Sequence, residues 1–361
     1  MEHAEKFSAA TIAYVRERIH SEAGLAELRQ IFQLPPEEIA SKLPGERPPV
    51  FGGDTTCVGI ETSEGHTIIL DCGSGLRGCA TDILRRRPLT KLSKVSLFGS
   101  HAHLDHRNGL AFAGICFADP PFEIEVFGGF EFLRLLDTRF GLFSRAATEG
   151  TFEDDPVDYS AMTASFRGIG FRDLTGAEEL KPDLDWEVRD PGEPVVIGST
   201  TVQPFRCYHG AIECLGYRIE HHGKVFVFST DHEKLSPETP GLAGLGSDAL
   251  GHSIRADQTL AEMCRGADLA YFDGQFLRAE YLGQKAVGSG PAVPRVGWGH
   301  GCVEDILDRM SGGEIKHALI GHHDPERSWS SLLDIAAQLQ EFSTGRDYEV
   351  ELARDGQVID L

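Results

Sequence analysis

The chain has 361 residues with the composition of an ordinary globular protein, 41% hydrophobic and 25% charged. Its formal net charge of −22 argues against long nucleic acid as a partner, because such a surface repels a polyanion. The eight cysteines are scattered without a CxxC pair, which favours reduced thiols in a cytoplasm over a disulfide framework. No apolar run has the length of a signal-peptide core or a membrane span. We therefore expect a cytoplasmic protein without a membrane partner.

The first 46 residues have a helical pattern. Ile12, Val15 and Ile19 recur at the spacing of one helix face, and "PPEEIASKL" opens with proline and acids as helix starts do. We predict a helical N-terminal extension over residues 1–46. It either docks on the body of the protein or contacts a second subunit, so a homo-oligomer is compatible with the sequence.

The remaining residues, 47–361, are predicted to form one domain of strands and helices. Acidic, turn-rich residues at 145–192 are expected to be an insertion or a lid. The closing residues 348–361 are predicted to form two strands joined by an Asp-Gly turn. Hairpins interleaved with helices favour a layered sheet sandwich flanked by helices. The principal predicted strands are 56–62, 67–71, 94–100, 123–128, 200–209, 268–274 and 317–323, together with residues 215–231, which contain a hairpin turn at "IEHHGK".

Metal-ligand residue types follow directly after four of these apolar strands. The first such segment is "SHAHLDH", with His101, His103, Asp105 and His106. Alternate residues of an extended segment point the same way, so His101 and His103 can chelate one ion. A helix is then expected to begin at Asp105, which turns Asp105 and His106 towards a neighbouring position.

The other three segments end in His209, Asp231 and His322, although His323 remains an alternative to His322. Imidazole suits zinc and iron, and a carboxylate can bridge two ions. The pattern predicts two divalent metal ions, with zinc expected and manganese or iron as alternatives.

These motifs together resemble the metallo-β-lactamase-fold hydrolase superfamily from about residue 48 to the C-terminus. The resemblance implies an α+β fold, a four-layer αβ/βα sandwich with the metals at one edge. It also implies that the Asp71 carboxylate binds no metal itself but orients the residues that do. In the family's pattern His101, His103 and His209 would hold one metal, Asp105, His106 and His322 the other, and Asp231 would bridge them.

Residues between Asp231 and His322 narrow the resemblance further. Asp231 stands where the best-known zinc β-lactamases have cysteine, which is similar to the phosphodiesterase, RNase Z and thioesterase branches. "YFDGQF" and "GWGHG" resemble two stretches of RNase Z-like and cyclic-phosphate phosphodiesterases. Carried over, Asp273 would polarise His300, and His300 would donate a proton to the leaving oxygen. Alternatively, Asp273 caps a helix and His300 packs beside Trp298 as a structural residue.

We therefore predict a dinuclear metal-dependent hydrolase, in first place a phosphoric diester hydrolase with Asp105, Asp273 and His300 as catalytic residues. The expected substrate is a small anionic phosphodiester, cyclic ones included, attacked by a hydroxide that bridges the two metals. Two alternatives stay open. One is a carboxylic ester, lactone or thioester hydrolase on the same site, which would not need His300. The other is a di-iron oxygen or redox sensor.

Overall fold

The computed structural model describes residues 14–33, 51–87, 94–117, 123–140, 163–169, 187–189 and 193–361. The chain divides into two compact units, Met1–Val50 with Ser328–Asp334, and Phe51–Arg327 with Ile335–Leu361. The described part of residues 1–46 contains helix α2 (Glu22–Ile31), whose first turn is capped by the Ser21 hydroxyl. Among the described residues, no helix combines the length and the apolar character needed to cross a bilayer.

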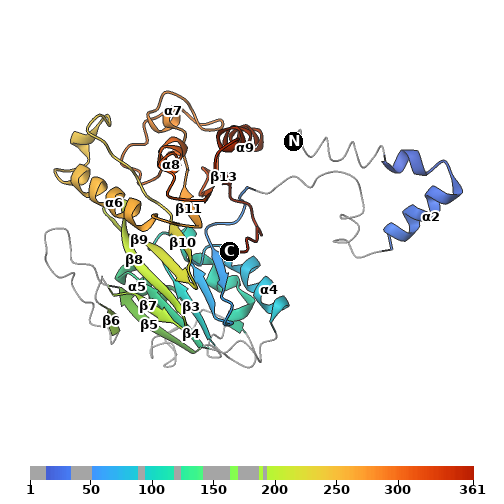
Figure 1. Cartoon of the computed structure of the whole chain (residues 1–361), viewed down its shortest axis with the longest axis horizontal. Helices are drawn as coiled ribbons and strands as arrows, with labels where there is room; N and C mark the ends of the chain where they lie inside the picture. Colours follow the sequence, from blue (N-terminus) through green and yellow to red (C-terminus); the bar gives the residue numbers. More distant parts are fainter. Residues whose placement is uncertain are drawn as a thin grey trace. The chain divides into compact units, whose positions relative to one another are not determined.

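The first sheet of the larger unit runs from β1 to β6 in chain order (Figure 1). β1 and β2 form an antiparallel hairpin, and the following strands pair in parallel. Part of the acidic range 145–192 contributes β5 and β6 to this sheet, while the rest of that range lies outside the described residues, so its role as a lid stays a prediction. The strands are β1 (Val58–Glu61), β2 (Thr67–Leu70), β3 (Lys94–Phe98), β4 (Glu123–Gly128), β5 (Thr163–Ile169) and β6 (Glu187–Arg189).

The second sheet runs from β7 to β13, again with sequential strands as neighbours. β7 to β10 pair in antiparallel fashion, whereas β10 to β13 are parallel. The predicted second strand of the C-terminal hairpin is absent, because the chain after the turn at residues 355–356 runs without strand pairing. The strands are β7 (Val195–Ile197), β8 (Thr200–His209), β9 (Ile212–His221), β10 (Lys224–Ser229), β11 (Leu269–Asp273), β12 (His317–Gly321) and β13 (Glu349–Leu352).

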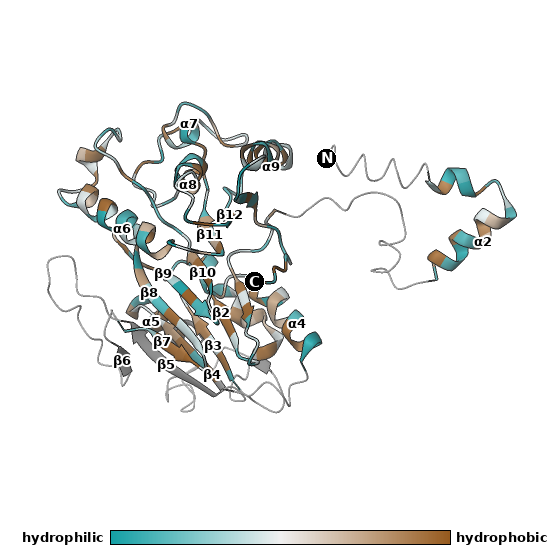
Figure 2. Cartoon of the chain, viewed as in Figure 1, coloured by the Kyte–Doolittle hydropathy of each residue, from teal (hydrophilic) through white to brown (hydrophobic). Residues whose placement is uncertain are grey.

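The main core lies between the two sheets. Strand β2 shows why, since all four of its side chains are buried and successive residues point to opposite faces. Ile68 and Leu70 join Phe98 and aromatic residues of the second sheet, such as Tyr217 and Phe228, in one apolar cluster. Figure 2 shows the apolar residues concentrated along the strands.

Helices cover the outer faces of both sheets. Ile69 packs with residues of α4 (Leu76–Arg86) and α5 (Phe130–Phe140) on the outer face of the first sheet. On the second sheet, α6 (Ala249–Met263) packs along β8, and Ile306 of α8 (Val303–Met310) lies near the end of β11. The remaining helices are α7 (Arg278–Tyr281) and α9 (Trp329–Ser343). The order helix–sheet–sheet–helix confirms the predicted α+β four-layer sandwich.

Candidate metal centre

The loop after β3 is built around the buried carboxylate of Asp71. Asp71 Oδ1 accepts the Ser100 main-chain N–H at 2.6 Å, and Oδ2 accepts the Ser100 hydroxyl at 2.8 Å. Asp71 Oδ2 also lies 2.7 Å from His106 Nδ1. The Ser100 oxygen in turn lies 3.0 Å from His101 Nδ1. Because β2 and β3 are parallel neighbours, the residue after β2 meets the loop after β3, and Asp71 orients two imidazoles at once.

One group of donor atoms contains His101, His103, His209 and one oxygen of Asp231. His103 Nδ1 lies 2.9 Å from His101 Nε2 and 3.1 Å from His209 Nε2. Asp231 Oδ2 lies 3.4 Å from His101 Nε2 and 3.6 Å from His209 Nε2. These four residues, predicted from three separate strand ends, therefore converge on one point.

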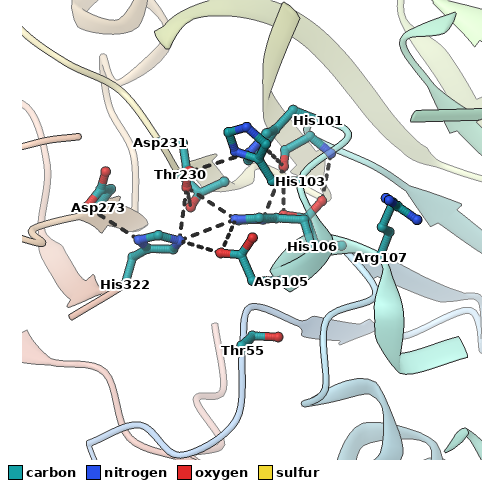
Figure 3. A network of polar contacts seen from close by, with 12 residues as sticks. Thr55, His101, His103, Asp105, His106, Arg107, Thr230, Asp231, Asp273 and His322 are labelled. Carbon is teal, nitrogen blue, oxygen red and sulfur yellow. Dashed lines mark hydrogen bonds and ion pairs between the residues drawn. The ribbon is translucent and has the colours of Figure 1, made fainter. Parts of the chain in front are cut away.

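A second group contains Asp105, His106 and His322. His322 Nε2 lies 3.3 Å from both His106 Nε2 and Asp105 Oδ2. Asp231 Oδ1 faces this group, at 3.3 Å from His322 Nε2 and 3.4 Å from His106 Nε2. The two oxygens of Asp231 thus point into different groups, and Figure 3 shows Asp231 between His322 and the histidines after β3.

In His106 and His209 one ring nitrogen bonds to the surrounding protein and the other faces the donor groups. His209 Nδ1 donates to the carbonyl of Gly299 at 2.8 Å, and His106 Nδ1 donates to Asp71. A neutral imidazole that donates through Nδ1 has a lone pair on Nε2. Nitrogen lone pairs and carboxylate oxygens that lie at about hydrogen-bonding distance from one another repel. A cation bound between them turns this arrangement into a stable one. The donor set therefore fits divalent metal ions.

Burial and carboxylates act in opposite directions on the site's histidines. Burial lowers the pKa of His101 well below its usual range and also lowers the pKa of His209. Burial opposes protonation of His322 as well, but Asp231 and Asp105 raise the pKa of that ring to about 9. The carboxylates therefore favour positive charge at the centre of the cluster, which is the bias that also attracts cations.

Three site residues adopt a left-handed backbone that side chains other than glycine rarely adopt. The φ angles are 57° for Asp71, 48° for Asp231 and 56° for His322. Each residue stands one or two positions after the end of a strand, β2, β10 or β12. Such a conformation costs on the order of 1 kcal/mol and is usually kept where function needs it. At these positions the turn directs His322, and not His323, into the cluster.

Asp273 and His300 lie at the border of both donor groups. Asp273, the last residue of β11, accepts the His300 Nδ1–H at 3.0 Å and the Gly301 N–H at 3.1 Å. The His300 ring stacks on His322 and meets His209 edge-on, each with ring centroids 5.1 Å apart. Burial disfavours a charged His300, but the charge and hydrogen bond of Asp273 raise its pKa. Asp273 does not cap α7, which begins at Arg278.

Glu233 is a site residue that the sequence reasoning missed. Its fully buried carboxylate accepts the Tyr281 hydroxyl at 2.6 Å, the Gly297 N–H at 2.7 Å and the Gly299 N–H at 2.8 Å. The carbonyl of Gly299 accepts His209 Nδ1, so Glu233 supports a loop that contacts the first donor group. The available signal was an acid two residues after Asp231 together with the glycine alternation of "GWGHG".

The glycines of that loop are required by its geometry. Gly297 and Gly299 have φ angles of 86° and 88°. A Cβ atom on Gly299 would lie 2.0 Å from His209 Nδ1, and one on Gly301 would lie 2.3 Å from the Asp273 carbonyl oxygen. The motif thus permits the close approach of the His300 loop to the donor groups.

Comparisons with known proteins concern the fold. No family model matches the sequence, and no curated protein is similar to it in sequence. Solved structures similar to the chain include the metallo-β-lactamase fold protein YhfI from Bacillus subtilis, with 15% identity, a TM-score of 0.49, and coverage of 86% of this chain and 95% of that one. Human tRNase Z, short form, has 15% identity, a TM-score of 0.48 and coverage of 86% and 95%. Yeast PDE1 has 12% identity, a TM-score of 0.49 and coverage of 83% and 93%. At these identities no activity follows from the likeness.

Proposed function

We propose that the chain is a dinuclear metal-dependent hydrolase that cleaves small phosphodiesters. The observation that supports this most directly is that the two oxygens of Asp231 face two different donor groups. The Asp273–His300 pair lies at the border of both groups. His101, His103 and His209 would hold one divalent ion, Asp105, His106 and His322 the other, and Asp231 both. Zinc is the ion we propose, with manganese and iron as alternatives.

The metal ions would supply Lewis-acid stabilisation of phosphoryl oxygens and activation of water. The chain's own contribution beyond binding them is a positioned proton. Asp273 accepts the Nδ1–H of His300, which leaves Nε2 to donate to a leaving oxygen. Asp273 raises the pKa of His300 against the effect of burial, which favours the acid form of the ring.

The substrate we propose is small and anionic, and cyclic diesters are included. The net charge of −22 disfavours a long polyanion. Three arginines near the site are buried and bonded within the protein. Arg107 donates to the Ala102 carbonyl, Arg295 to the carbonyls of Glu280 and Val293, and Arg327 to the Glu280 carboxylate and the Gln275 carbonyl.

The substitution His300→Ala tests the proton donor. We expect kcat to fall about 10²–10⁴-fold on a 2′,3′-cyclic nucleotide, whose alkoxide leaving group needs a proton. The loss should be much smaller on bis-p-nitrophenyl phosphate, because p-nitrophenolate leaves without one. The matched control is His252→Ala on α6, which should leave both rates unchanged.

Three outcomes would contradict the proposal. Equal and small losses on both diesters would remove His300 from the mechanism. Hydrolysis of carboxylic esters, lactones or thioesters without any diester cleavage, unaffected by His300→Ala, would establish the alternative hydrolase on the same site. Two redox-active irons in a protein inert towards both classes of substrate would favour a sensor.

A further inference from the structure

Trp298 is an exposed residue of the loop that carries the proposed proton donor. The residue is 54% exposed, although the next residue, Gly299, is buried. An indole is large and mostly apolar, so a half-exposed one contributes little to the core while leaving apolar surface in water. Trp298 stands two residues before His300, so this apolar surface belongs to the loop that carries the proposed proton donor.

The backbone around Trp298 is held on both sides. The Glu233 carboxylate accepts the N–H of Gly297 and the N–H of Gly299, the two neighbours of Trp298. The N–H of Trp298 itself donates to the carbonyl of Arg295 at 3.1 Å. These hydrogen bonds hold the main chain that carries the indole. The loop therefore loses less conformational entropy when a ligand binds against the indole.

The indole and the His300 ring share one buried neighbour. The Phe276 ring meets Trp298 edge-on with centroids 6.4 Å apart and meets His300 edge-on at 6.2 Å. The guanidinium carbon of Arg295 lies 5.7 Å from the indole centroid. These contacts support the indole from within the protein and tie its position to that of His300.

Two other site loops also carry an exposed apolar side chain. Leu104, between His103 and Asp105 in the sequence, is 56% exposed. Ile212, which pairs with His209 across the β8–β9 hairpin, is 41% exposed. Each of the three loops that contribute His103, His209 and His300 thus presents an exposed apolar side chain, whereas the nearby arginines are buried.

We propose that Trp298 binds a planar aromatic group of the substrate by stacking, so that the enzyme selects diesters that carry such a ring. The inference rests on the proposed phosphodiesterase function and adds the substrate class. A nucleobase and an aryl ester group share the required flat π face. Stacking on an aromatic side chain changes binding by roughly 5- to 150-fold per ring.

The test compares substrates with and without a ring in Trp298→Ala, Trp298→Phe and the unchanged full chain. For a purine 2′,3′-cyclic nucleotide, we expect Trp298→Ala to raise KM about 10-fold with kcat nearly unchanged, and Trp298→Phe to keep most of the affinity. For the base-free cyclic phosphate of ribose, neither variant should change KM. Phe112→Ala is the matched control, because Phe112 is 67% exposed and lies outside the His300 loop.

Bis-p-nitrophenyl phosphate distinguishes the two sources of the ring. If Trp298→Ala raises KM for the cyclic nucleotide alone, the bound ring is a nucleobase. If it raises KM for the cyclic nucleotide and for bis-p-nitrophenyl phosphate, the site accepts any aromatic group. Equal changes for ring-bearing and base-free substrates, or a fall in kcat alone, would show that Trp298 only shapes the loop and would overturn the inference.

A binding measurement separates this inference from the proposed reaction. Calorimetry on the zinc-loaded protein would compare adenosine 5′-monophosphate with ribose 5-phosphate. If binding of the nucleotide depends on Trp298 while no diester is cleaved, the phosphodiesterase proposal fails and aromatic recognition stands. If diesters are cleaved while both ligands bind equally to the unchanged chain and to Trp298→Ala, aromatic recognition fails and the phosphodiesterase stands.

Discussion

The two loops that line the site are anchored in the same way but present different side chains. Ser100–His106 is organised by Asp71, and residues 297–301 are organised by Asp273 and Glu233. In both loops a buried carboxylate accepts a main-chain N–H, and in both it or a partner carboxylate accepts an imidazole Nδ1–H. The first loop buries His101 and His106 and leaves His103 and Leu104 exposed, whereas the second leaves Trp298 exposed and His300 partly so.

The two loops also differ in glycine content. Gly297 and Gly299 turn the second loop through left-handed backbone, so its N–H groups face Glu233 while the side chain between them faces outward. The first loop has no glycine between Ser100 and His106, and its imidazoles point towards the carboxylates. One kind of anchor therefore supports proposed metal ligands in one loop and proposed substrate contacts in the other.

The largest effect is expected from Asp231→Asn. This change removes the charge that faces His101 and His106 of the first loop and that links both donor groups. Asparagine tolerates the left-handed backbone, so the change removes charge without adding strain. We expect activity to fall by about 10³-fold or more, because the lost metal stabilisation amounts to several kcal/mol. Metal analysis should show fewer than two ions per chain. Asp257→Asn on α6, outside both groups, is the control, and two tightly bound ions with full activity in Asp231→Asn would refute the bridging role.

Asp71→Asn weakens the anchor of the first loop alone. Asp71 orients His106 directly and His101 through Ser100, one member of each donor group. We expect zinc affinity, measured by competition with a chelator, to fall about 10–100-fold. Asp82→Asn on α4 should leave zinc affinity unchanged. If Asp71→Asn binds zinc as tightly as the original chain, the carboxylate serves only the fold.

Glu233→Gln is the corresponding change in the second loop, and its effect should be smaller. The amide keeps the shape of the side chain but replaces one acceptor oxygen by a donor facing an N–H or hydroxyl. We expect the free energy of unfolding to fall by about 1–3 kcal/mol and kcat to fall about tenfold, since the loop carries His300. Combining it with His300→Ala should produce little further loss of kcat. A fully additive loss would mean that Glu233 acts independently of His300, and Glu220→Gln on β9 is the control.

Asp273→Asn should give the smallest and most diagnostic change, a shift in the pH dependence. The Asp273 carboxylate raises the pKa of His300 against burial, so the acid form persists to higher pH. Without that charge the pKa falls, and the alkaline limb of the kcat profile on a cyclic nucleotide should move to lower pH. Asp268→Asn, before the opposite end of β11, should leave the profile in place. An alkaline limb that stays in place in Asp273→Asn would assign it to another group.

Much of the fold and of the proposed ligand set could be predicted, because both depend on patterns among residues that are close in the sequence. Two-residue alternation predicts that His101 and His103 act together, and an apolar run such as residues 94–100 predicts a buried strand. The local signal was wrong at two places. The helix expected at Asp105 is a short 3-10 segment, Leu104–His106, and the expected last strand is not paired.

The sequence by itself determined which residue types stand at the strand ends and therefore that a metal site is expected there. Only the tertiary structure decided which oxygen of Asp231 faces which group, that Glu233 supports the His300 loop, and that Trp298 stays exposed. The physical reason is range. Side-chain periodicity acts over a few residues, whereas the meeting of Asp71, Asp231 and His322 depends on strand order and on two sheets packing face to face.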